Sequence, residues 1–159
     1  MHPILDILED NAFTAPETIA QMVQKPVDEV RRLIRQYEAD RVILGYKAII
    51  DNEKANRDLV RAIIEVKITP EREGGFDRIA SRIAKYEEVQ SCYLMSGAYD
   101  LLVLVDGPDL KQVARFVSEK LSTIAGVLST ATHFMLKSYK ERGTLFLQDE
   151  EGERLKVSP

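Results

Sequence analysis

Charged side chains recur at helical spacing in the segment that follows Pro26. The positions in question are Asp28, Arg31, Arg32 and Arg35. They stand at i, i+3, i+4 and i+7, so a helix places all four on one exposed stripe. Guanidinium groups in such a stripe clamp phosphates or read guanine bases. The alternative is a solvated helix face on which Asp28 pairs with the two nearest arginines. The pattern alone leaves both interpretations open.

Cysteine and histidine are too sparse for the metal and thiol chemistry that these residues support. Cys92 is the only cysteine, which excludes an internal disulfide and a thiolate cluster. His2 and His133 lie far apart, without a second ligand at a metal-motif spacing. We expect Cys92 and His133 to be ordinary packed residues. The sequence therefore favours a protein without a metal, a cofactor or a catalytic centre.

Length and composition indicate a packed protein of one medium domain or two small ones. The chain has 159 residues, of which 45% are hydrophobic and 30% charged, and a net charge of −4. Nucleic-acid binding would thus depend on a local basic face and on several copies acting together. The longest apolar runs, about six residues, are too short for a membrane span. Acidic residues among the first ten positions interrupt any signal peptide, so we expect a cytoplasmic protein.

Three short helices are predicted before residue 50. Apolar spacing predicts a first helix over 4–10 and a second that opens at Thr14, with Glu17 completing a capping box. A third begins at Pro26, after a tight turn. Short apolar runs around Gly45 predict a small strand pair, or wing. Three helices followed by a wing indicate a winged helix-turn-helix.

The second half of the sequence alternates strand and helix patterns. The expected elements span 62–68, 76–84, 89–95, 99–105, 109–126 and 127–136. Asp109 is expected to cap the second of the two helices, and Gly126 to end it. The order βαββαβ predicts a ferredoxin-like domain, in which both helices cover one face of a four-stranded antiparallel sheet. The fold class is therefore α+β, and the uncovered sheet face is expected to dimerise.

These patterns divide the chain into four parts. We expect a winged helix-turn-helix domain over 1–50, a ferredoxin-like domain over 60–140 and a C-terminal extension over 141–159. Residues 51–59 are polar and without periodicity, which indicates a linker or an exposed bridging strand. In the extension, apolar residues on both sides of 149–152 indicate either a small hairpin or a loose acidic tail.

Four segments together resemble the Lrp/AsnC (feast/famine) family of bacterial and archaeal transcription regulators over residues 4–140. They are ILDILEDNAFT, RVILGYKAIID, VQSCYLMSGAYDLLVLV and IAGVLSTATHFML. The resemblance implies a regulator and not an enzyme. It implies a homodimer, often assembled into tetramers or octamers, in which paired helix-turn-helix units bind double-stranded DNA. It also implies that the second domain, called RAM, binds a small effector between subunits, usually an amino acid.

Carried over by position, the resemblance implies two sets of site residues. It makes the helix after Pro26 the recognition helix, with DNA contacts from Lys25, Arg31, Arg32 and Arg35. It makes the SGAYD loop and the last strand the effector pocket, with contacts from Gly97, Ala98, Tyr99, Asp100, Thr130 and Thr132. Asp100 and the threonines offer oxygen atoms that suit the charged groups of a free amino acid.

The sequence departs from the family at three places. Gln24-Lys25-Pro26 replaces the usual Gly-Leu-Ser turn, acids occupy the first turn of the recognition helix at Asp28 and Glu29, and Ala98 replaces an acidic residue. Two alternatives therefore stay open. One is an effector-sensing partner protein that has lost DNA binding. The other is an enzyme similar to the sirohaem decarboxylases, which share this two-domain architecture.

Overall fold

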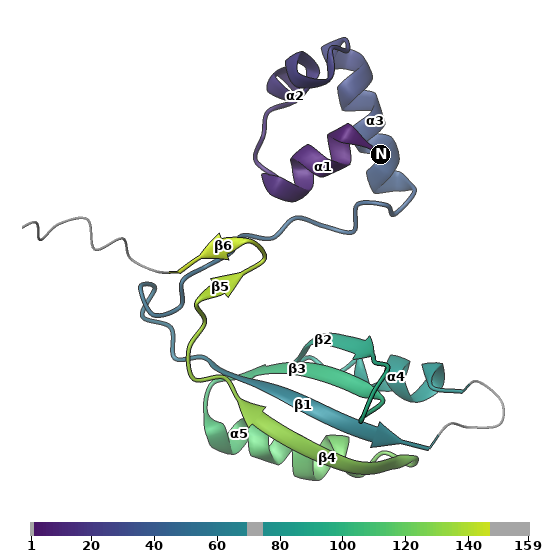
Figure 1. Cartoon of the computed structure of the whole chain (residues 1–159), viewed down its shortest axis with the longest axis vertical. Helices are drawn as coiled ribbons and strands as arrows, with labels where there is room; N and C mark the ends of the chain where they lie inside the picture. Colours follow the sequence, from purple (N-terminus) through teal and green to yellow (C-terminus); the bar gives the residue numbers. More distant parts are fainter. Residues whose placement is uncertain (1, 70–74, 147–159) are drawn as a thin grey trace, which may run out of the picture. The chain divides into compact units, whose positions relative to one another are not determined.

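Two units follow one another along the chain, Met1–Ile49 and Ile50–Pro159. The computed structural model describes residues 2–69 and 75–146, and Figure 1 labels their α-helices and strands. Unit 1 consists of α1 (Pro3–Asp10), α2 (Pro16–Val23) and α3 (Val27–Ala39). The elements of unit 2 are β1 (Val60–Ile68), α4 (Asp77–Ile83), β2 (Val89–Leu94), β3 (Leu101–Gly107), α5 (Leu110–Arg115), the π-helical η1 (Phe116–Leu121), β4 (Val127–Phe134), β5 (Lys140–Glu141) and β6 (Thr144–Leu145). Among the described helices, none combines the length and the apolar character that a membrane crossing requires.

Unit 1 is built around a small apolar core. Its buried side chains are Ile4, Leu8, Ile19, Ala20 and Val30, contributed by all three helices. α2 ends at Val23 and is capped by Gln24, whose left-handed φ of 54° turns the chain, while the Lys25 amide still donates to the Ala20 carbonyl at 3.0 Å. α3 begins at Val27, so only a short turn joins the two helices. This is the arrangement of a helix-turn-helix.

The capping box predicted for α2 is wrong. The helix begins at Pro16, which suits a first helical position because proline has no amide hydrogen to leave unpaired. Ala15 occupies the N-cap and provides no side-chain bond. The Thr14 hydroxyl donates instead to the carbonyl of Asn11 at 2.8 Å. Glu17 is consequently free to reach another helix.

The predicted wing is also wrong as a strand pair, because residues 41–59 contain no strand. The amides of Val42 and Ile43 both donate to the Tyr37 carbonyl, at 2.8 and 3.0 Å, and so close the end of α3. The amides of Val42 and Ile43 are therefore not available to pair as the first strand of a hairpin. Tyr46 anchors the remainder through a 3.0 Å hydrogen bond from its hydroxyl to Glu38. Residues 52–56 form turns, so the bridging strand considered for 51–59 is absent as well.

Unit 2 contains a four-stranded sheet with the order β2-β3-β1-β4, and all of its neighbours are antiparallel. β1 lies in the middle, where Val66 pairs with Leu101 on β3 and with Thr130 on β4. The predicted βαββαβ order and the α+β class are confirmed. The reason is local, because the two central strands, β1 and β3, alternate buried and partly exposed residues.

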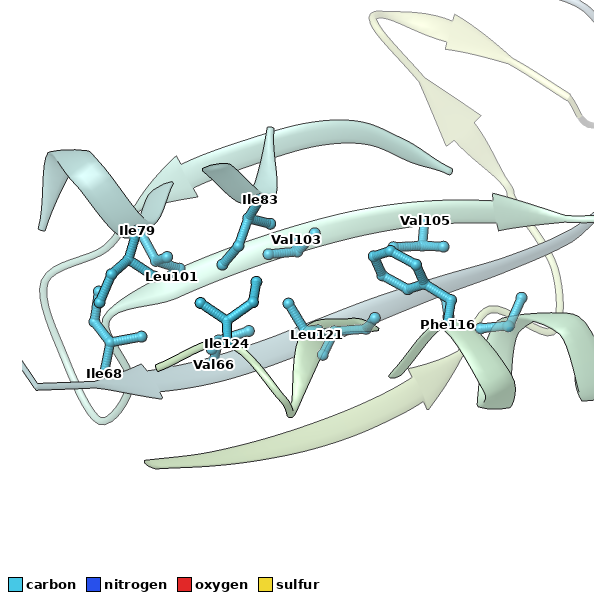
Figure 2. Close-up of a cluster of buried hydrophobic side chains, with 13 residues drawn as sticks. Val66, Ile68, Ile79, Ile83, Leu101, Val103, Val105, Phe116, Leu121 and Ile124 are labelled. Carbon is cyan, nitrogen blue, oxygen red and sulfur yellow. The ribbon is translucent and has the colours of Figure 1, made fainter. Parts of the chain in front are cut away.

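Both helical segments cover one face of this sheet. Ile79 and Ile83 of α4, together with Phe116 and Leu121 of η1, pack against Val66, Val103 and the other buried strand residues (Figure 2). The opposite side carries alternate residues of the same strands. Ile63, Leu102 and Leu104 lie on this side, outside the core cluster that the helices cover, and are half-buried; we call them the uncovered face.

Two elements differ from their predicted form. Asp109 caps α5 as expected, accepting from the Gln112 amide at 2.8 Å, but the helix changes to π-helical bonding at Phe116 and ends at Leu121. Within the described residues β5 and β6 form a hairpin, which turns at Arg142 and Gly143, both with positive φ. The hairpin or loose tail predicted around 149–152 lies outside the described residues.

Candidate functional site

The α3 stripe, defined as Asp28, Arg31, Arg32 and Arg35, is exposed along its whole length. The opposite side of α3 packs inward through the buried Val30 and the half-buried Leu33, Ile34 and Tyr37. The three arginines consequently point away from the core. One helix face thus presents three guanidinium groups to solvent, as the spacing predicts.

Two basic side chains near the start of this surface already take part in ion pairs. Lys25 donates to Glu29 at 2.5 Å, and this hydrogen bond lowers the pKa of the Glu29 carboxyl below its ordinary value. Arg31 pairs with Glu17 of α2 and not with Asp28. Within residues 2–69 and 75–146, Arg32 and Arg35 have no ion-pair partner. These two arginines are therefore the residues of the stripe that can most readily donate hydrogen bonds to an anion.

Sequence reasoning missed the partners of Lys25 and Arg31. The i, i+4 spacing of Lys25 and Glu29 is a signal that could have revealed the first pair. The second joins residues fourteen positions apart on different helices, and no local pattern predicts it. Two further exposed basic residues, Arg41 and Lys47, follow the stripe in the segment for which the sequence predicts a wing.

The SGAYD loop connects β2 to β3 and is anchored by Asp100. The Asp100 carboxylate accepts from the Ile68 amide at 2.8 Å, and the Asp100 amide donates to the Val66 carbonyl at 3.0 Å. Gly97 and Ala98 are exposed, whereas Tyr99 and Asp100 are half-buried. One carboxylate oxygen of Asp100 thus already has a backbone partner at the end of β1, and the other has none in the described chain.

The two threonines lie across β1 from this loop. Thr130 pairs with Val66 and Thr132 with Ile64, whose side chains are buried beneath the helices, so both threonines point to the helix-covered side of β4. The Thr130 hydroxyl lies 3.4 Å from that of Ser122, just after η1. In one chain the loop and the threonines therefore do not converge, since β1 separates them.

The uncovered face combines apolar and charged residues. Ile63 pairs with Leu104 in the middle of the face, and half-buried side chains there give an apolar patch. At its margin the His133 imidazole lies 3.5 Å from the Glu65 carboxylate. His133 is thus exposed on the sheet, and the predicted packing of this residue requires a second surface. Cys92 does pack against the core, and burial raises the pKa of its thiol.

At the end of the sheet opposite the SGAYD loop, the Arg61 side chain links β1 to β3 and β5. Its guanidinium donates to both oxygens of Asp106 on β3, at 2.7 and 3.1 Å, and to Glu141 on β5 at 3.1 Å. The hydrogen bonds that Arg61 donates to Asp106 are the main reason that the pKa of Arg61 is raised. Beside this network lies an open hollow of about 450 Å³. In the described part of the chain, no three metal-ligating side chains come together.

Known proteins match both the second unit and the whole chain. The model of the Lrp/AsnC ligand binding domain matches residues 61–145. YugG, an HTH-type transcriptional regulator of Bacillus subtilis (strain 168), is 48% identical over 157 residues, covering 98% of this chain and 95% of the relative. The proline dehydrogenase transcriptional activator of Rhizobium radiobacter is 26% identical over 140 residues, covering 88% of this chain and 89% of the relative.

Solved structures agree with these matches. The complex of the transcriptional regulator NMB0573 of Neisseria meningitidis with L-Met superposes with a TM-score of 0.68. It is 26% identical, and the match covers 87% of this chain and 89% of that chain. The resemblance predicted from the sequence is confirmed: this chain belongs to the Lrp/AsnC family of transcriptional regulators.

Proposed function

We propose that the protein binds double-stranded DNA through the α3 stripe and the adjoining Lys25. The observation that carries this proposal is the exposure of three arginines on the second helix of a helix-turn-helix. Among the described residues Arg32 and Arg35 form no salt bridge, although the charge of Arg32 acts on Glu29, and both can donate to phosphates or guanine edges. Arg31 is shared with Glu17. Asp28 and Glu29 lie in the first turn of α3, where the positive end of the helix dipole stabilises their negative charges. They also limit how tightly one copy can bind.

The second unit is proposed to bind an amino-acid-like effector at the SGAYD loop, with Gly97, Ala98, Tyr99 and Asp100 from one chain. Support comes from the solved relative that contains L-Met and from the free oxygen of Asp100, which suits an ammonium group. Thr130 and Thr132 are separated from this loop by β1 in the same chain. Both also point to the helix-covered side of β4, away from the uncovered face. Their participation would therefore need a subunit that approaches from that side, in an assembly larger than the dimer.

A homodimer is the smallest assembly that we propose, with tetramers or octamers built from it. The uncovered face supplies the apolar area that a second copy would bury. Paired DNA-binding units also compensate for the net charge of −4, because two weak contacts on one duplex act together. An effector with different affinity for two such assemblies would change the spacing of the DNA-binding units.

We infer that the protein works without catalysis and in the cytoplasm, where a regulator meets DNA. Its relatives are transcriptional regulators, and the described residues gather no metal-binding cluster. A colour change on titration with haem or sirohaem would revive the decarboxylase alternative. A chain that fails to bind DNA even at low salt, yet binds an amino acid, would favour the alternative of a sensing partner protein.

A titration with DNA tests the proposal. The probe is the upstream region of the protein's own gene, measured by fluorescence anisotropy at two salt concentrations. We expect affinity to fall steeply with salt, because each phosphate contact releases counterions. Arg35→Ala should weaken binding and reduce the salt dependence, whereas Arg115→Ala, an exposed arginine of α5, should change neither. Equal binding by both variants would contradict the assignment of the stripe.

A further inference from the structure

Unit 1 has an apolar surface that the α3 stripe does not use. Phe13 is 98% exposed and Met22 is 62% exposed. Both line an open hollow of about 700 Å³, whose walls come from α1, residues 11–15 and α2. We call this hollow the α1–α2 groove. Large apolar side chains gathered around a hollow mark a surface that a partner covers.

The exposure of Phe13 is built into a tight loop. The Phe13 amide donates to the Asn11 side chain at 3.0 Å. The amide and the hydroxyl of Thr14 both donate to the Asn11 carbonyl, at 3.1 and 2.8 Å. Three hydrogen bonds to one residue therefore fix the loop that presents the aromatic ring. A preformed loop of this kind binds a partner at a low entropic cost.

The charge around the groove selects its occupant. Residues 2–24 contain four acids, Asp6, Glu9, Asp10 and Glu17, and neither lysine nor arginine. Asp6 and Asp10 line the groove itself. Such a surface repels DNA phosphates. A symmetric contact with a second copy is also disfavoured, because it would bring the same acids face to face.

We propose that the α1–α2 groove binds a basic amphipathic segment of another protein. Apolar residues on one side of that segment would pack on Phe13, Met22 and Ile7, and its lysines or arginines would pair with Asp6 and Asp10. The groove takes its walls from α1, residues 11–15 and α2, while the DNA contacts proposed above lie on α3 and at Lys25. Partner and DNA therefore bind at the same time, and the groove recruits a protein to the DNA-bound regulator.

Selection from a displayed library of random peptides, each about 16 residues long and so about four helical turns, tests the chemistry of the occupant. The full chain is the bait, and Phe13→Ala is used to remove peptides that bind elsewhere. We expect enriched peptides to carry lysine or arginine together with apolar residues at i, i+3 and i+4. The proposal is overturned if nothing is enriched, or if the enriched peptides lack a basic bias.

An enriched peptide is then synthesised with a fluorescent label and titrated with the full chain. Phe13→Ala and Asp10→Lys should each weaken binding about tenfold, in the range typical of central interface residues. Matched controls are Tyr139→Ala, at an exposed aromatic residue of unit 2, and Glu119→Lys, at an exposed acid of η1. Both controls should bind like the wild type. Equal losses in the controls would overturn the groove as the site.

Two parallel measurements separate this inference from its rivals. Phe13→Ala should leave both DNA affinity and the sedimentation coefficient unchanged, because Phe13 contributes to neither surface in our account. A variant that sediments as a smaller particle would show that a second copy covers the groove. A variant with weaker DNA binding would show that DNA covers it. Either result overturns the proposal, and circular dichroism checks that the variant is folded.

Discussion

Arg31 links the two helices of the helix-turn-helix and occupies the middle of the proposed DNA surface. Its partner is Glu17 of α2, so the carboxylate holds one guanidinium in place and also neutralises it. Exposed pairs of this kind are weak, and a phosphate competes readily with the carboxylate. The pair therefore orients Arg31 at the expense of part of its affinity for DNA.

Glu17→Gln is expected to strengthen DNA binding. The substitution frees Arg31 and removes a negative charge next to the stripe, so affinity at low salt should rise about two- to fivefold. Anisotropy with a labelled duplex measures the effect. Glu9→Gln serves as the control, because it removes the same charge from α1 and should leave the affinity nearly unchanged. A loss of affinity in Glu17→Gln would show that positioning outweighs neutralisation.

Glu88 provides a test of pH dependence. A hydrogen bond from Lys120 lowers the pKa of the Glu88 carboxyl below its ordinary value in the folded chain. The unfolded chain takes up this proton first as the pH falls. The stabilisation is therefore present above the ordinary glutamate pKa and is lost as the pH falls through the lower, folded value.

Glu88→Gln should accordingly be less stable than the wild type at pH 7, and the difference should shrink as the pH falls below the ordinary glutamate pKa. Denaturant unfolding of both proteins at a series of pH values measures this difference in the free energy of unfolding. The effects of the other carboxylates cancel, because both proteins contain them. A difference that stays constant with pH would mean that packing, and not the ion pair, carries the contribution of Glu88.

The strands and helices of unit 2 were predictable because their signals are local. Alternation along β1 and helical spacing in α4 depend on a few neighbouring residues, and so does the Asp109 cap. The predicted wing failed because a helix carbonyl at Tyr37 takes both amides that a strand would need. Hydrogen bonds that close a helix end compete with strand pairing, and apolar runs around Gly45 carry no sign of that competition.

Close packing between α4 and the residue that precedes β4 gives a prediction for Gly126. Its φ is +94°, and a Cβ atom there would meet the Ile79 side chain at 2.6 Å. Gly126→Ala should therefore destabilise the protein by about 1–3 kcal/mol, from backbone strain and overpacking. In the control Gly45→Ala, the added Cβ has no neighbour within 4 Å, so the free energy of unfolding should change by less than about 0.5 kcal/mol. Denaturant unfolding compares the two variants, and equal stability would contradict this packing.

The assembled molecule depends on surfaces that only folding creates. The sequence places Asp100 beside a glycine in a loop, but its bond to the Ile68 amide joins residues 32 positions apart. The strand order likewise decides that β1 separates this loop from Thr130 and Thr132. Residue types and the element order were thus predictable, whereas the geometry of the proposed effector site depends on strand pairing and, in our proposal, on a second subunit.

Leu104→Lys tests the uncovered face as the dimer surface. A lysine in the middle of an apolar interface loses its hydration without gaining a partner, so the dimer should dissociate. Sedimentation velocity should show a particle of half the mass. Leu110→Lys, a change at an exposed leucine at the start of α5, is the control and should remain dimeric. A Leu104→Lys dimer would contradict our assignment of this face.

The central claim is that an amino acid bound to unit 2 changes how the α3 stripe binds DNA. The most direct test is a titration of the labelled upstream duplex at two salt concentrations, with and without each amino acid in turn. We predict salt-sensitive binding that shifts with at least one amino acid and a shift that disappears in Asp100→Ala. Binding that no amino acid alters, or an equal shift in Asp100→Ala, would contradict the account.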